Sequence, residues 1–171
     1  MKKFLVSTFA LAVIALISTS AFAASPQTSP LGLSATVINN CTITTTPVAF
    51  GNYDPLSGSA NQATGTVGIT CTKNAATTIT LGDGNNGVRQ MKDAGSQLMA
   101  YELYQPPDNT PGTACSYASP TRWGVVSGQI FTPAAAPSKV ARTYNVCGQI
   151  PAGQDLAAAL FTDTVVATVN F

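Results

Sequence analysis

The 171-residue sequence contains no histidine and little charge of either sign. Without histidine, the serine–histidine and cysteine–histidine arrangements of nucleophilic catalysis cannot form. Seven carboxylates are present, and six lie in turn-like segments or beside glycine or proline, which predicts turn and cap roles. The sequence therefore predicts no catalytic residue, no cofactor and no enzyme, although a pair of carboxylates brought together as in a glycosidase stays open.

Metal and nucleic-acid sites also lack their usual residues. No two cysteines have the spacing of a zinc site, and no histidine is present to act as a ligand. Charged residues make up 9% of the chain, and the two signs nearly balance. A nearly neutral chain gives no reason to expect nucleic acid or an anionic membrane surface as a partner.

Residues 1–23 have the pattern of a secretory signal peptide. Lys2 and Lys3 precede an apolar run at residues 4–17, and Ala21-Phe22-Ala23 has the small-x-small form of a cleavage site. The run is too short to cross a bilayer, so we expect no membrane span in the mature form. We expect export by the Sec pathway to the periplasm, and then a place at the cell surface or secretion.

The four cysteines are an even set in an exported chain, so disulfides are expected. We favour Cys41–Cys71 and Cys115–Cys147, because each pairs neighbours in the sequence. Each bond would close a loop of about 30 residues and contribute about 3–4 kcal/mol in the chain-entropy account. The sequence alone leaves the other two pairings open.

Apolar residues that alternate with polar ones predict strands along most of the chain. The predicted strands lie at residues 42–46, 66–72, 77–81, 98–104, 123–132, 139–150 and 164–171, and turn-forming residues fill positions 51–65. The helix-favouring run at residues 155–160 is too short to form a stable helix. Seven or eight short strands without a convincing helix predict an all-β antiparallel sandwich.

The segment LGLSATVINNC at residues 31–41 places one apolar set on one face of a strand: Leu31, Leu33, Ala35 and Val37. A terminal strand of this kind must pair within its own fold or be offered to another molecule. Asn39 and Asn40 could form a tight turn that folds residues 31–38 against residues 42–48. From the residues alone, both interpretations stay open.

Several motifs in a fixed order resemble the spore coat protein U domain family, which includes the pilins of archaic, Csu-type chaperone–usher systems. They are SATVINNCTI, AFGNYDP, GTVGITCT, TITLGDG, Arg89-x-Met91, LMAYELY, Trp123-Gly124, the segment at residues 149–154 and TDTVVATVNF. Two departures are visible. Ala159-Leu160-Phe161 stands where the family pattern has Gly-x-Tyr, and Cys115 with Cys147 is additional to the more typical Cys41 with Cys71.

The resemblance implies an immunoglobulin-like sandwich, at residues 39–171, that lacks its final strand. Residues 24–38 would form a flexible leader and a donor strand whose inward residues are Leu31, Leu33, Ala35 and Val37. The acceptor groove would lie beside the last strand, with inward residues Val165, Ala167, Val169 and Phe171. An incomplete fold exposes core and a strand edge, which explains why a periplasmic chaperone would lend it a strand.

In such systems an outer-membrane usher replaces the chaperone's strand with the donor strand of the next subunit, and the subunits form a head-to-tail polymer. The resemblance thus implies a structural subunit of a surface pilus that serves adhesion and biofilm formation. Two alternatives come from other classes. One is a secreted or spore-coat structural protein that fills its own groove, and the other is a carbohydrate-binding or glycosidase-like module.

Overall fold

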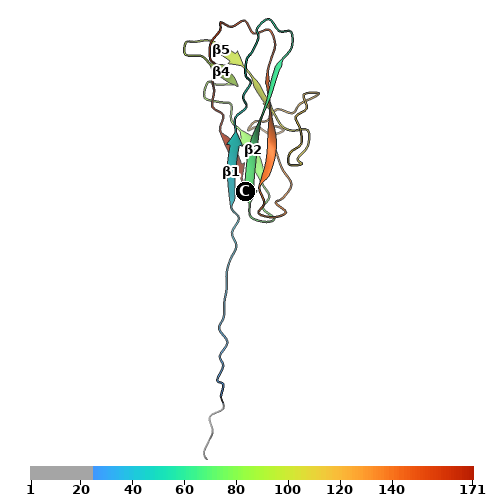
Figure 1. Ribbon diagram of the computed structural model, residues 1–171. Helices are drawn as coiled ribbons and strands as arrows, with labels where there is room; N and C mark the ends of the chain where they lie inside the picture. The colour runs from blue at the N-terminus through green and yellow to red at the C-terminus, as the bar shows by residue number, and fades with distance from the viewer. Residues whose placement is uncertain (1–24) are drawn as a thin grey trace, which may run out of the picture. The chain divides into compact units, whose positions relative to one another are not determined.

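Antiparallel β-strands are the only regular secondary structure in residues 25–171, the part of the chain that this computed structural model describes (Figure 1). The expected signal peptide lies outside the described residues. Residues 37–171 form one unit, and the leader up to Thr36 belongs to a separate one. The eight strands are β1 (Cys41–Thr46), β2 (Asn61–Cys71), β3 (Thr78–Leu81), β4 (Gln90–Lys92), β5 (Leu98–Ala100), β6 (Glu102–Tyr104), β7 (Arg142–Ile150) and β8 (Ala167–Asn170).

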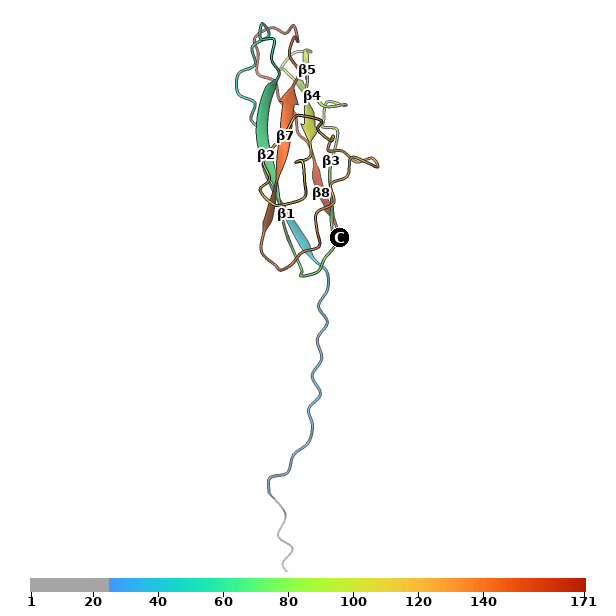
Figure 2. The ribbon, with the colours of Figure 1, turned by 90° about the vertical axis from the view of Figure 1, so that its right-hand side faces the viewer.

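The strands form a main sheet and two short pairs (Figure 2). The main sheet has the order β1-β2-β7-β6, while β3 pairs with β8 and β4 pairs with β5. All these pairings are antiparallel, so the predicted all-β antiparallel architecture is confirmed. β1 lies at one edge of the main sheet, and β8 lies at the edge of a different sheet.

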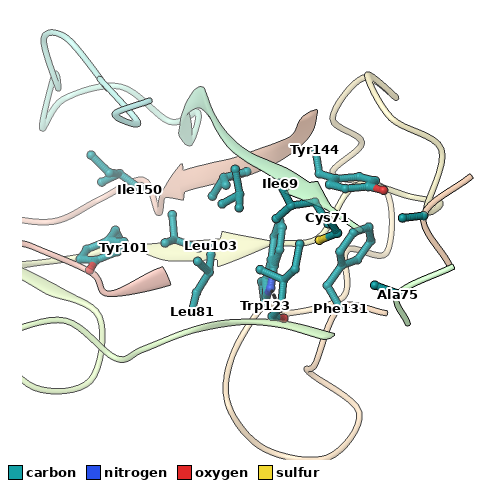
Figure 3. Close-up of a cluster of buried hydrophobic side chains, with 14 of the residues drawn as sticks. Ile69, Cys71, Ala75, Leu81, Tyr101, Leu103, Trp123, Phe131, Tyr144 and Ile150 are labelled. Atoms are coloured by element: carbon teal, nitrogen blue, oxygen red, sulfur yellow. Dashed lines mark hydrogen bonds between the residues drawn. The ribbon is translucent and has the colours of Figure 1, made fainter. Parts of the chain in front are cut away.

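The core lies between the main sheet and the β3–β8 layer. β2 contributes Val67 and Ile69, β3 contributes Ile79 and Leu81, and all four side chains are buried. Figure 3 shows Trp123, Phe131 and Tyr144 gathered at one end of this core, with Tyr101 and Ile150 at the other. The ring centroid of Phe131 lies 4.9 Å from that of Trp123 and 5.0 Å from that of Tyr144, within the range of favourable aromatic contacts.

Two disulfides fasten the body, and both are the pairings that the sequence favoured. Cys41 bonds Cys71, and these residues lie directly opposite each other in the β1–β2 ladder. Cys115 bonds Cys147 and so ties the long loop after β6 to β7. The first bond therefore fixes the register at the beginning of β1.

The prediction of turns up to residue 65 was wrong for residues 61–65, which are the first part of β2. This part of β2 pairs with the last residues of β7, and the ladder outweighs the weak strand preference of Asn61, Gln62 and Gly65. The packing of the chain that follows β1 requires glycine at position 65. A Cβ atom at Gly65 would lie 2.7 Å from the carbonyl oxygen of Thr46, so only glycine lets the chain after β1 cross so closely.

Two other predicted strands also differ. Residues 98–104 are interrupted at Tyr101, whose backbone N–H donates to the carbonyl oxygen of Arg89, so β5 pairs with β4 while β6 pairs with β7. Residues 123–132 form no strand: Phe131 makes a single bridge to Ile79 of β3, and the backbone N–H of Trp123 donates to the carbonyl oxygen of Leu103 in β6. β4 carried no strand pattern strong enough to be predicted.

Trp123→Ala tests how much the packing of this core contributes to the free energy of unfolding. Trp123 is fully buried, and its Nε1–H donates to the carbonyl oxygen of Ile79 at 2.9 Å. Removing the ring should lower the free energy of unfolding by about 3–5 kcal/mol, as measured by urea denaturation followed by far-ultraviolet circular dichroism. Trp123→Phe keeps most of the ring volume and should cost clearly less. Equal losses for the two variants would contradict the packing role.

Candidate functional site

An open groove runs between β1 and β8. Within the described residues no strand hydrogen-bonds the free edge of either one, because β1 pairs only with β2 and β8 only with β3. Cα atoms of the two strands nevertheless approach within 8 Å. Two edges that face each other without a ladder between them form the place where a sandwich would accept one more strand.

The groove has two sides of different origin and a floor of core residues. One side is formed by the end of β1 and the chain that follows it, up to Phe50, and the other by residues 163–167. Its floor includes Val67, Leu81 and Leu103, which belong to the buried core. The cavity has a volume of about 270 Å³.

A second cavity continues the groove toward the β4–β5 hairpin. It lies between residues 48–53 and residues 156–161, has a volume of about 740 Å³, and shares Val48, Phe50 and Met91 with the first. Leu156 and Phe161 face it from the second side and pack against the core while only partly buried. Because they share Val48, Phe50 and Met91, the two cavities form one continuous channel, lined by both apolar and polar groups.

Half-buried apolar side chains line both sides of the groove. Val165, Ala167 and Val169 alternate with exposed residues and pack against the core, as does Phe161, while the half-buried residue between Phe161 and Val165 is Asp163. On the opposite side Ile43, Val48 and Phe50 are half-buried and also pack against the core, without a regular two-residue period. These side chains have core contacts below them and no cover above, so an apolar strand with a two-residue period would complete their burial.

The residues predicted for the acceptor strand fall into this arrangement with one exception. Val165, Ala167 and Val169 point toward the core, while Phe171 is 55% exposed. The residues predicted for the donor strand form no strand, and Leu31, Leu33 and Val37 are at least 83% exposed. β1 takes β2 as its partner at Cys41–Thr46, where the hairpin interpretation would have paired residues 42–48 with residues 31–38.

Gly148 of β7 sets the depth of the groove. A Cβ atom there would lie 2.4 Å from Cγ1 of Val48 and 2.8 Å from Cζ of Phe50. Only glycine, which has no Cβ atom, leaves Val48 and Phe50 room to lie flat on the sheet. The close approach holds the first side of the groove against β2 and β7.

Asp163 fastens the second side, and sequence reasoning assigned it only a turn role. Its carboxylate accepts hydrogen bonds from the Tyr101 hydroxyl at 2.6 Å, from the Asn85 backbone N–H at 2.9 Å and from the Asn86 side chain at 3.1 Å. The Gly-rich turn at residues 82–87 thus supplies donors to a carboxylate far along the chain. No sequence signal could have found this network, because its partners are 62 to 78 residues away.

Tyr101 is held in its neutral form. Burial, and secondarily its hydrogen bond to Asp163, raises the pKa of the Tyr101 hydroxyl above its usual range. The neutral hydroxyl remains a donor to the carboxylate. The pair therefore joins the floor of the groove to its second side.

Within residues 25–171, no three side chains of the cysteine, aspartate or glutamate type gather as metal ligands would. Nor does this part of the chain contain a helix with the length and hydrophobicity of a membrane span.

Comparison with known proteins places the chain in a family. A family model described as the Spore Coat Protein U domain matches residues 27–168. The chain belongs to the spore coat protein U domain family. The match includes both sides of the groove and most of the leader, and it confirms the resemblance that the sequence motifs showed.

One curated relative and one solved structure are similar to this chain. Protein U of Myxococcus xanthus is 32% identical over 141 residues, which are 71% of this chain and 70% of that protein. A solved structure, the CsuC–CsuE chaperone–tip adhesion subunit pre-assembly complex from archaic chaperone–usher Csu pili of Acinetobacter baumannii, matches with a TM-score of 0.54 and 23% identity. The match covers 80% of this chain and 41% of that one, and it shows a shared fold.

Asp163→Asn should weaken the second side of the groove. The substitution keeps the shape but removes the charge that strengthens the hydrogen bonds from Tyr101 and Asn85, so we expect a loss of about 1–3 kcal/mol in the free energy of unfolding, measured in urea. Asp54→Asn is the matched control. Asp54 is an exposed turn residue whose carboxylate caps the Leu56 N–H, and an amide oxygen serves equally well there. Equal losses in both variants would contradict the role of Asp163.

Stability should also decline at alkaline pH. Because the pKa of Tyr101 is higher in the folded state than the usual value of about 10, the unfolded chain loses this proton first, and the free energy of unfolding falls as pH rises above about 10. Tyr101→Phe removes this contribution, so its urea midpoint should decline less steeply with pH than that of the unchanged chain. Parallel declines would contradict the assignment.

Proposed function

We propose that this chain is a structural subunit of a bacterial surface pilus, polymerised by donor-strand exchange. The observation that carries the proposal is the groove between two edge strands, with half-buried apolar residues at every second position from Val165 to Val169 on one side and at Ile43, Val48 and Phe50 on the other. Residues 31–37 have the complementary pattern, and their apolar side chains are exposed. A strand from one molecule can therefore supply what the core of another lacks.

The empty groove is narrower than a filled one would be. Neighbouring strands lie about 4.7–4.9 Å apart, so a strand inserted between β1 and β8 needs roughly 9–10 Å between them. The two strands now come closer than that. Insertion of the donor would spread them, and burial of Leu31, Leu33 and Val37 supports that opening with roughly 5–9 kcal/mol before ordering costs.

The proposed partners follow from the exposed groove. A periplasmic chaperone would cover it by lending a strand, and an outer-membrane usher would exchange that strand for the leader of the next subunit. The contact joins two different surfaces, so it propagates into a head-to-tail fibre. The chain would pass through the periplasm after its signal peptide is removed and would serve adhesion and biofilm formation on the cell surface.

A second candidate comes from the family's name and from Protein U of Myxococcus xanthus. In it the chain is a secreted or coat protein whose own leader fills its own groove. Both candidates use the same apolar residues, but the first gives polymers and the second gives a complete monomer. The size of the purified protein in solution, polymer or monomer, therefore distinguishes the two candidates.

Leu33→Asp should prevent polymerisation, because it would bury a carboxylate in an apolar groove without a partner. Cells that produce this variant should lack fibres in the electron microscope, and unboiled samples should lose the ladder of detergent-resistant oligomers. Ser34→Asp is the matched control, since it adds the same charge one residue later, on the opposite face of the donor strand. Fibres that tolerate Leu33→Asp as well as Ser34→Asp would overturn the donor assignment.

A further inference from the structure

The two ends of the body carry opposite charge. At one end, which we call the β1 end, the chain enters β1 and residues 38–42, 70–76 and 134–142 come together. Asn40 and Thr72 exchange hydrogen bonds there, and Ala136 donates to the carbonyl oxygen of Ala75 and accepts from the N–H of Asn74. These three segments contain no aspartate or glutamate.

The β1 end is positive. Lys73 and Lys139 are exposed and line one shallow hollow with Cys41 and Cys71. Arg142, the first residue of β7, is buried and donates a hydrogen bond to the carbonyl oxygen of Ala134. Among the described residues neither lysine has an ion-pair partner.

The opposite end, which we call the hairpin end, is negative. Figures 1 and 2 show the β4–β5 hairpin at the end of the body away from the beginning of β1. Three loops form this end: the loop between β1 and β2, the loop between β4 and β5, and the loop after β7. They carry Asp54, Asp93 and Asp155, while the positively charged side chain at this end of the described body is Lys92. Asp54 and Asp155 are exposed and, within residues 25–171, take part in no ion pair.

Hydrogen bonds lock the three loops of the hairpin end into one surface. The Tyr53 hydroxyl donates to the carbonyl oxygen of Pro151 at 3.0 Å and accepts from the Gln154 N–H at 2.9 Å. The Ala157 N–H donates to the side chain of Gln97 at 2.9 Å. The three loops that carry the acidic residues are therefore joined to one another.

A short linker forces neighbouring bodies into contact, if the proposed donor strand is correct. Only Ile38, Asn39 and Asn40 separate Val37, the last donor residue, from Cys41, the first residue of β1. A fully extended chain rises at most about 3.3–3.6 Å per residue, so these positions lie within about 14 Å of each other. The β1 end of the donating subunit must therefore rest on the end of the receiving body from which its linker emerges.

We propose that this contact is an electrostatic one, between the β1 end of each subunit and the hairpin end of the next copy of the same chain. The inference rests on the proposed donor-strand exchange and adds a second interface to it. Lys73 and Lys139 of one copy face Asp54, Asp93 and Asp155 of the other. The donor then runs antiparallel to β8, with Val37 toward the hairpin end.

The reverse direction would bring two β1 ends together. Four exposed lysines, two from each copy, would then meet without a carboxylate side chain in the surrounding segments, and like charges in contact are unfavourable. The exposed apolar side chains of the hairpin end favour the same direction of the donor strand. Leu56 and Leu160 at the hairpin end are 95% and 80% exposed, and the neighbouring body would cover them.

Zero-length cross-linking of the assembled, unmodified chain tests the contact. A carbodiimide joins a lysine amine to a carboxylate only when the two touch, and mass spectrometry identifies the joined peptides. We expect links from Lys73 or Lys139 to Asp54, Asp93 or Asp155, and these links should decline in ~1 M salt, where the Debye length is about 3 Å. Fibres without such links would overturn the proposal, as would amine-specific links that join Lys73 to Lys73 or Lys139 to Lys139, because only two copies with their β1 ends in contact can form these.

Charge reversal adds a test by rescue. Lys73→Asp with Lys139→Asp should give fibres of shorter persistence length in the electron microscope, and adding Asp54→Lys with Asp155→Lys should restore it. Lys92→Glu is the control of opposite sign, because it makes the hairpin end more acidic and should leave the fibres at least as stiff. A lack of rescue, with urea midpoints unchanged, would also overturn the proposal.

The oligomer ladder separates failure of this proposal from failure of donor-strand exchange. The strand joint does not involve the lysines, so the ladder of detergent-resistant oligomers should persist in every charge variant. A persistent ladder without the cross-links refutes only the electrostatic contact. If the unmodified chain forms no polymer at all, both proposals fall.

Discussion

The incomplete cover of one hydrophobic core is the constraint on which the rest of this structure depends. β2, β3 and β7 bury their apolar residues fully, but the sides of the groove between β1 and β8 are only half-buried. Apolar surface left in water weakens the folded state, and two free strand edges invite pairing with another chain. A body of this kind is best explained as one part of a larger assembly.

The two sides of the groove are fastened by different contacts. The first is held by the Cys41–Cys71 bond at the beginning of β1 and by the close approach over Gly148. The second is held by the pairing of β8 with β3 and by the carboxylate of Asp163. Tyr101 links the two sides through the floor, because its ring centroid lies 6.5 Å from that of Phe50 and its hydroxyl donates to Asp163.

Because the surface is mostly neutral and rich in hydroxyl groups, each charged residue contributes strongly to the electrostatic potential near it. With 9% charged residues, isolated charges at the two ends of the body are not masked by surrounding ones. The buried Arg89 contrasts with them, because it donates hydrogen bonds to the carbonyl oxygens of Leu81 and Trp123 inside the body. Charges inside this chain therefore hold loops together, while those at its ends remain available to a neighbour.

The sequence by itself determined the strand-rich class and the family, because alternation and motifs are local patterns. It favoured both disulfide pairs, but the structure decided them. The sequence also identified the two-residue period of Val165, Ala167 and Val169. Only the tertiary structure decided that residues 61–65 join β2, that residues 98–104 divide between two sheets, and that Asp163 bonds Tyr101. These outcomes depend on partners far along the chain, and pairing and packing between distant segments overrule weak local preferences.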